Sequence, residues 1–322
     1  MNPGVGYALF AFGTWGLVPL YFALLSAVPA LEVVLHRALG SLLFLLLVLA
    51  WMGRWGWLKD VVRAPRQLAM LALSATLIAA NWGVYVHAVQ TGQVLQSSLG
   101  YFINPLVNVA LGVLVLRERL RPAQWLAVAV AVAGVGWLTW DAGEPPWIAL
   151  ALAGLFGVYG LVRKTAPLGA LEGLTAETML LAPVALAALL WLGSGLGPGG
   201  WTWGLGSVSL DAATWGWLAL SGPLTALPLL AFAAAARRLT LATLGVIQYL
   251  SPSMQFVLGL TVFGEAFDAG RAVGFALIWV ALAIYSAEAV WSARRAGSAA
   301  GAAAAVTAAG VATSAGPDER MR

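Results

Sequence analysis

The segment "LEVVLHRALG" over residues 31–40 places Glu32, His36 and Arg37 at the start of a long apolar run. In a helix, Glu32 and His36 share one face, and Arg37 lies about 100° further round. An arginine hidden from lipid can dock an anionic or zwitterionic solute, and a histidine or a glutamate can take up and release a proton. The structural alternative pairs Arg37 with Glu32, with a carboxylate of another helix or with helix-end carbonyls.

Two prolines in apolar runs follow polar residues, in Asn104-Pro105 and Ser251-Pro252. Proline has no N–H and frees the carbonyl four residues earlier, which needs another partner in hydrocarbon. Helical spacing puts polar side chains around each proline on one stripe. The first stripe holds Tyr101, Asn104 and Asn108, and the second holds Gln248, Ser251 and Gln255, with Tyr249 beside it. We expect opposing walls of a cavity, with interhelical hydrogen bonding as the structural alternative.

Three further residues complete the candidate site. Asn81 and Tyr85 share a helical face, and Trp15 can add an aromatic wall. The chain has two histidines and no cysteine, too few for a histidine- or thiolate-based metal cluster. We therefore expect neither a bound metal nor a cofactor.

The elements that position these residues must be membrane helices. Hydrophobic residues make up 61% of the 322 residues and charged residues 9%, whereas ordinary soluble domains have about a quarter charged residues. Apolar stretches of ~20 residues recur along the chain. A backbone in lipid must satisfy its own hydrogen bonds, which favours helices. The sequence predicts an all-α polytopic membrane protein with ten transmembrane helices, over 4–24, 31–51, 68–89, 95–116, 122–140, 147–164, 173–193, 213–236, 242–263 and 269–291.

The connecting segments alternate in charge. One set carries thirteen Lys and Arg residues, and the other set carries one, Arg271. Because basic segments stay on the cytoplasmic side, both termini are expected in the cytoplasm. The formal charge of +4 is spread over these short clusters, so the expected partners are the lipid bilayer and a small-molecule solute, not nucleic acid.

The chain contains an internal repeat. "FGTWGLV" at 12–18 returns as "FGVYGLV" at 156–162, and "NPLVNVALGVLVLRE" at 104–118 returns as "SPSMQFVLGLTVFGE" at 251–265. We expect two five-helix repeats, 1–140 and 147–292, followed by a low-complexity, disordered tail over 296–322. Because five is odd, the second repeat enters the membrane inverted, which is typical of transporters. The alternative is that duplication only made a larger bundle.

The repeat aligns the region of Glu177 with that of Arg37. Inversion places Glu177 nearer the cytoplasmic side, away from Arg37. Glu177 is thus a third candidate for proton coupling, beside Glu32 and His36. Glu265, which follows the second proline-containing helix, is expected to have a structural role.

Seven segments along the chain form a recognisable set: "FGTWGLVPLYF", "HRALGS", "NWGVYVHAV", "SLGYFINPLVNVALG", "RPAQWLAV", "YGLVRK" and "LIWVALAIY". These segments resemble the RarD branch of the EamA transporters, in the drug/metabolite transporter superfamily. The resemblance implies a bacterial inner-membrane transporter of ten helices with a central cavity, acting in export. It supplies no substrate.

The expected function is therefore that of a secondary transporter that moves a small polar or amphipathic metabolite or drug by alternating access. An intramembrane enzyme is the first alternative, but the sequence has no H-E-x-x-H motif and no phosphate-binding glycine loop. A non-transporting scaffold is the second, and it would not need polar side chains at repeat-related kinks.

Overall fold

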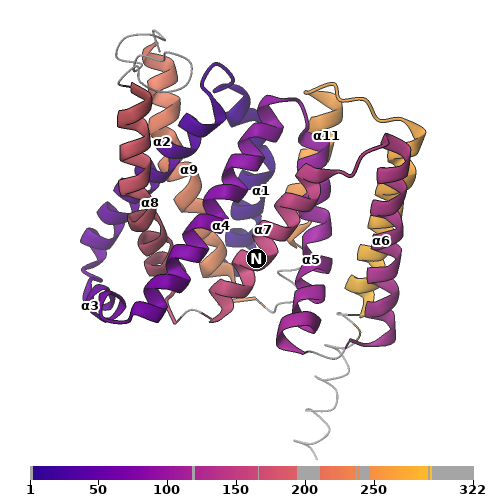
Figure 1. Cartoon of the computed structure of the whole chain (residues 1–322), viewed down its shortest axis with the longest axis horizontal. Coiled ribbons are helices and arrows are strands. Elements are labelled where there is room, and N and C mark those ends of the chain that lie inside the picture. The colour runs from indigo at the N-terminus through magenta and orange to yellow at the C-terminus, as the bar shows by residue number, and fades with distance from the viewer. Residues whose placement is uncertain are drawn as a thin grey trace, which may run out of the picture.

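The computed structural model describes residues 3–117, 120–165, 167–193, 211–236, 238–239, 247–288 and 291. All regular structure in this part of the chain is helical (Figure 1). The helices are α1 (Pro3–Ala23), α2 (Ala30–Met52), α3 (Gly56–Val62), α4 (Pro65–Gln90), α5 (Val94–Leu116), α6 (Pro122–Ala142), α7 (Trp147–Thr165), α8 (Ala170–Gly193), α9 (Ala212–Ala236), α11 (Leu250–Thr261) and a last helix over Ala269–Glu288.

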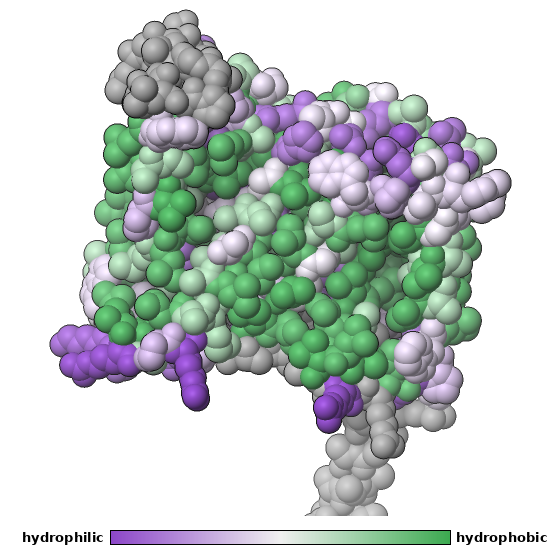
Figure 2. Space-filling model, in the orientation of Figure 1, coloured by the Kyte–Doolittle hydropathy of each residue, from purple (hydrophilic) through white to green (hydrophobic). Residues whose placement is uncertain are grey.

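Eight helices in the described ranges are long and apolar enough to cross a membrane: α1, α2, α4, α5, α6, α8, α9 and the last helix. A shorter apolar helix covers Trp147–Arg163 in α7. On the face that Figure 2 shows, an apolar belt lies between two polar edges. The molecule is thus a multi-pass membrane protein, as its composition predicts.

Two details differ from the sequence-based expectation. The connection after the second span contains α3, a short helix that buries Val61. Its mixture of polar and aromatic residues gives no span-like signal. The span expected over 242–263 is not one helix where the structure describes it, because Tyr249 forms a turn before α11. Pro252 then falls in the first turn of α11, where a missing N–H costs little.

Successive long helices run in opposite directions. The connections over 24–29, 91–93, 143–146 and 262–268 lie at one end of the bundle, the upper end of Figure 1. The connection over 53–64, which contains α3, and the connection over 167–169 lie at the other end. We call the end with α3 the α3 end.

Helices from the two halves of the chain pack against each other, an arrangement that we call the swapped packing. α1 packs on α9 and α11, while α7 packs on α4 and α5. α2 packs on α8 and α9, α8 also packs on α4, and α5 packs on α11. α6 stands beside the last helix (Figure 1), where the Trp137 indole donates a hydrogen bond of 2.9 Å to the Gly270 carbonyl. Most of the long helices thus pack mainly against helices from the other half of the chain.

The closest crossing joins α2 and α9. A Cβ added to Gly40 would lie 3.4 Å from the Cα of Gly222, so the two backbones are nearly in contact. Small residues at membrane helix crossings permit this approach.

Glu265 caps the start of α5. Its carboxylate accepts hydrogen bonds from the backbone N–H groups of Val94, at 2.5 Å, and of Leu95, at 3.0 Å. These groups lie in the first turn, where a helix has no partners of its own for its donors. Burial raises the pKa of Glu265 above its ordinary value, and the two N–H donors act in the opposite direction. The structural role expected for Glu265 is confirmed.

Candidate solute-binding site

Arg37 lies two turns into α2 among side chains of four other helices. Its Nε donates a hydrogen bond of 2.7 Å to the hydroxyl of Thr225 in α9. Thr225 in turn donates to the Ser221 carbonyl at 2.8 Å, which fixes its lone pairs toward Arg37. Arg37 is itself only partly buried.

Aromatic rings surround the Arg37 guanidinium. Its Cζ lies 4.3 Å from the centre of the Trp82 ring in α4 and 5.5 Å from that of Phe22 in α1. The Phe22 and Tyr85 rings are 6.0 Å apart, and Tyr85 is 5.8 Å from Tyr101 of α5. We call Phe22, Trp82, Tyr85 and Tyr101 the aromatic cluster. A cation over such ring faces gains electrostatic stabilisation without a counter-ion.

Arg37 has no acidic partner in the described part of the chain. The ion pairs there are Arg54–Glu172, Arg121–Glu288 and Arg163–Glu177. The structural alternative that pairs Arg37 with Glu32 or with another carboxylate is therefore not what the described residues show. The Tyr85 hydroxyl, in the same aromatic cluster, is buried and has no hydrogen-bond partner in the described residues.

Glu32 and His36 turn away from this environment toward their own helix and α9. His36 Nδ1 lies 2.9 Å from the Glu32 carbonyl oxygen, and its ring meets Trp215 of α9 edge-on at 5.7 Å. Glu32 is partly exposed in the first turn of α2. These contacts resemble those of a helix end near the membrane surface more than those of a proton relay to Arg37.

The first polar stripe divides along α5. Tyr101 belongs to the aromatic cluster, and Asn104 is 7% exposed with its side-chain oxygen unpartnered in the described structure. Asn108 is exposed, and its Oδ1 lies near Gly157 of α7. The structure thus brings only Tyr101 to the neighbourhood of Arg37.

The second stripe lies in another environment. Gln255 is 1% exposed, and its Nε2 donates to the Trp15 carbonyl at 3.1 Å and to the Ser251 hydroxyl at 3.3 Å. Pro19 in α1 cannot donate to that carbonyl, so Gln255 supplies the missing donor. This contact is the interhelical link that the sequence left open as the alternative to a cavity wall.

The remaining expected residues are placed as follows. The Tyr249 ring stacks on Phe102 of α5 at 6.4 Å, and Gln248 is partly buried just before it. Asn81 is buried and donates to the Leu152 carbonyl of α7 at 3.3 Å. The Trp15 ring packs against Phe12 at 5.4 Å. Of the twelve cavity residues expected, Arg37, Tyr85 and Tyr101 form one cluster.

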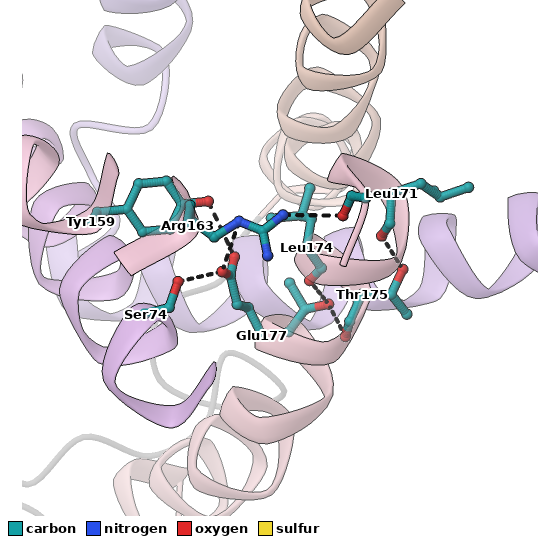
Figure 3. A network of polar contacts seen from close by, with 9 residues as sticks. Ser74, Tyr159, Arg163, Leu171, Leu174, Thr175 and Glu177 are labelled. Carbon is teal, nitrogen blue, oxygen red and sulfur yellow. Dashed lines mark hydrogen bonds and ion pairs between the residues drawn. The ribbon is translucent and has the colours of Figure 1, made fainter. Parts of the chain in front are cut away.

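A second polar cluster, shown in Figure 3, surrounds Glu177 two turns after the start of α8 at the α3 end. Glu177 of α8 is fully buried and accepts a hydrogen bond from the Ser74 hydroxyl of α4. The Tyr159 hydroxyl of α7 donates to its other oxygen at 3.2 Å, and Arg163 Nε lies 3.6 Å from the carboxylate. Arg163 lies near the end of α7, inside the span expected over 147–164. We call Ser74, Tyr159, Arg163 and Glu177 the Glu177 cluster.

Sequence reasoning missed Phe22, Thr225, Ser74 and Tyr159 as site residues. Each has an ordinary side chain for an apolar helix, and only its contact with Arg37 or Glu177 distinguishes it. Trp82 directly follows Asn81, which could have drawn attention to it. In the described residues, no three His, Cys, Asp or Glu side chains gather as a metal site would require.

Known proteins resemble this chain closely. An uncharacterized transporter of Pseudomonas aeruginosa is 46% identical over 291 residues, covering 89% of this chain and 94% of the relative. Protein RarD of Escherichia coli is 44% identical over 282 residues, covering 88% and 93%. Protein RarD of Streptomyces exfoliatus is 46% identical over 281 residues, covering 87% of both chains. The EamA-like transporter family matches residues 2–140.

The chain belongs to the RarD branch of the EamA transporters. This confirms the resemblance drawn from the motifs, and the EamA chain is accordingly a membrane transporter. A solved crystal structure is similar in fold, with a TM-score of 0.57 and 18% sequence identity, covering 87% of this EamA chain and 96% of the solved one.

Proposed function

We propose that this EamA protein is a secondary transporter for a small amphipathic solute with an anionic or zwitterionic head. The observation that carries the proposal is Arg37, a partly buried charge among membrane helices that has Thr225 as its hydrogen-bond partner and no acidic partner in the described residues. A cation in this position is costly unless it is paired. A carboxylate or phosphate on the solute would supply the counter-charge.

The aromatic cluster supports an amphipathic solute. Phe22, Trp82 and Tyr85 are buried beside Arg37, and Tyr101 is partly exposed. Their rings offer apolar surface to the body of the solute, while the Tyr85 hydroxyl offers a free hydrogen-bonding group. Sites with an apolar lining and a few convergent polar groups are typical of small-molecule binding.

Alternating access by two inverted five-helix repeats, 1–140 and 147–292, is the mechanism we infer. The swapped packing supports it, since α1 on α9 corresponds to α7 on α4 and α1 on α11 to α7 on α5. The family match over 2–140 coincides with the first repeat. The ninth span would include 242–249, of which 242–246 lie outside the described residues.

The proposed direction is export from the cytoplasm across the bacterial inner membrane, with both termini in the cytoplasm. Basic residues gather in the connections at the α3 end, which supports a cytoplasmic location for that end. Reporter fusions after residues 55 and 144 test the orientation. A cytoplasmic signal at 55 and a periplasmic signal at 144 are expected, and the reverse result would overturn the topology.

To test transport, the amounts of anionic metabolites in the culture medium are compared between cells that express the wild type, Arg37→Gln or Arg37→Lys. The metabolite exported by the wild type is then measured in counterflow with proteoliposomes. We expect exchange without product formation, lost in Arg37→Gln and partly kept in Arg37→Lys. Chemical conversion of the metabolite would indicate an enzyme, and equal exchange by all three proteins would remove Arg37 from the site.

A further inference from the structure

The Glu177 cluster joins three helices through one buried carboxylate. Ser74 belongs to α4, Tyr159 and Arg163 belong to α7, and Glu177 belongs to α8 (Figure 3). Arg163 also donates from Nη2 to the Gly169 carbonyl at 3.0 Å, while its Nη1 is buried without a partner in the described structure. The Glu177 carboxylate thus receives contacts from both α4 and α7 and links these two helices to α8.

The contacts of Glu177 favour its ionised form in this arrangement. The hydroxyls of Ser74 and Tyr159 both donate to the carboxylate, and Arg163 pairs with its charge. An ionised carboxylate only accepts hydrogen bonds, so these contacts suit the charged form of Glu177. If a proton binds to one carboxylate oxygen, that oxygen becomes a donor and the Arg163 charge loses its counter-charge. Both changes oppose the contacts that hold α4 and α7 to α8.

The charged surroundings of Glu177 are simple. Tyr159 and Arg163 are the titratable groups that face it from α7, and α4 faces it with Ser74, which does not titrate at accessible pH. Glu172, on the same helix, is paired with Arg54. The ionisable residues of α2, which also packs on α8, lie near the opposite end of the bundle. α3 packs beside the neighbouring Ala176 through Val61, and its Lys59 and Asp60 are exposed. The ion pair that a proton at Glu177 would break is therefore the one with Arg163.

We propose that Glu177 is the proton-binding site that couples this transporter to the proton gradient. The proton binds to a carboxylate oxygen of Glu177, breaks the ion pair with Arg163 and frees α4 and α7 from α8 at the α3 end. Loss of the proton restores the three contacts and closes that end. This inference rests on the proposed transport function and selects Glu177 over Glu32 and His36.

The test measures the α3 end directly, without a solute. Because the chain has no cysteine, spin labels can be placed at Ala69→Cys in α4 and Ala170→Cys in α8, two exposed positions near the starts of their helices. Pulsed electron paramagnetic resonance in lipid nanodiscs gives their distance between pH 5 and pH 9. We expect a longer distance at low pH in the wild type and the same long distance at every pH in Glu177→Gln.

Two further variants complete the experiment. Glu172→Gln removes a carboxylate on the same helix outside the cluster and should keep the wild-type pH response. Tyr159→Phe removes one donor to the ionised carboxylate, so it should move the midpoint of the distance change to higher pH. Tyr159→Phe also serves as the test if Glu177→Gln fails to fold.

The outcomes separate this inference from the proposed function. A wild-type distance that does not change with pH, or an unchanged midpoint in Tyr159→Phe, would overturn the assignment of Glu177 even if Arg37-dependent exchange is intact. The same holds if Glu177→Gln responds to pH like the wild type. Conversely, a pH response that depends on Glu177 would support the proton site even in a protein whose solute binds away from Arg37.

Discussion

Arg37 and Glu177 occupy matching places in two helices but have opposite surroundings. Each lies seven residues after the first residue of its helix, Ala30 in α2 and Ala170 in α8. Glu177 has three side-chain donors, one of them a counter-ion, whereas Arg37 has one hydroxyl, aromatic faces and no acidic partner in the described residues. The Glu177 carboxylate links three helices, whereas the Arg37 guanidinium has no counter-ion in the described residues, which is why we propose it as a solute contact.

The largest contrast is expected for stability. Glu177→Ala leaves Arg163 buried without its counter-charge and should lower the free energy of unfolding by about 3–5 kcal/mol. Arg37→Ala removes a charge that has no ion pair, so stability should stay level or rise while solute exchange is lost. Thermal unfolding of both variants in detergent measures this difference. A large loss of stability in Arg37→Ala would instead assign Arg37 a structural role.

A smaller effect is expected at Thr225. Thr225→Val keeps the shape of the side chain but removes the acceptor for Arg37 Nε. A lost hydrogen bond of about 1 kcal/mol corresponds to a roughly fivefold weaker apparent affinity for the exported metabolite. Counterflow measured over a range of metabolite concentrations tests this. Thr76→Val is the matched control, because Thr76 is exposed on α4 and bonds its own helix.

Substitution of Gln255 should lower stability without changing solute affinity, the opposite of what we expect for Arg37→Ala. Gln255→Leu leaves the Trp15 carbonyl without its donor, so the free energy of unfolding should fall by about 1 kcal/mol. Solute affinity should not change, since Gln255 links α1 to α11 rather than facing Arg37. A clear change in affinity without loss of stability would return Gln255 to the binding site.

The smallest effect is expected at Glu265, outside the spans. Because burial raises its pKa in the folded protein, the folded state holds the proton more tightly than the unfolded chain. The associated stabilisation is complete below the ordinary pKa of glutamate and is lost as the pH rises through the raised value. Glu265→Gln should therefore show a smaller fall in Tm between pH 4 and pH 7 than the wild type. An equal fall in both proteins would contradict this.

The sequence predicted the spans well but the site only in part. Most helices begin and end within a few residues of the hydropathy-based ranges, because the cost of polar groups in lipid depends on local composition alone. Arg37 was also identifiable, as a charge within an apolar run. Its contacts were not, since Phe22 and Thr225 come from two other helices and carry no distinguishing signal along the chain, and Trp82 is marked only by its place beside Asn81.

For the same reason, the sequence could not predict the contacts of the two polar stripes. Helical spacing placed Gln248, Ser251 and Gln255 on one face, but not what that face contacts. Gln255 meets Trp15 because Pro19 leaves that carbonyl without a donor, and the relation spans two distant segments. A stripe of polar residues on a membrane helix therefore predicts contact with other polar groups, whether they belong to a solute or to the protein.

The close crossing of α2 and α9 restricts how the molecule can move. Gly40 lies one turn after Arg37, and Gly222 lies one turn before Thr225, so the backbone contact and the side-chain hydrogen bond are adjacent. Sliding one helix past the other would push a bulkier residue into the space that a glycine now leaves. These two helices should consequently travel as a single rigid body, and the solute would cross when the remaining helices tilt around that body.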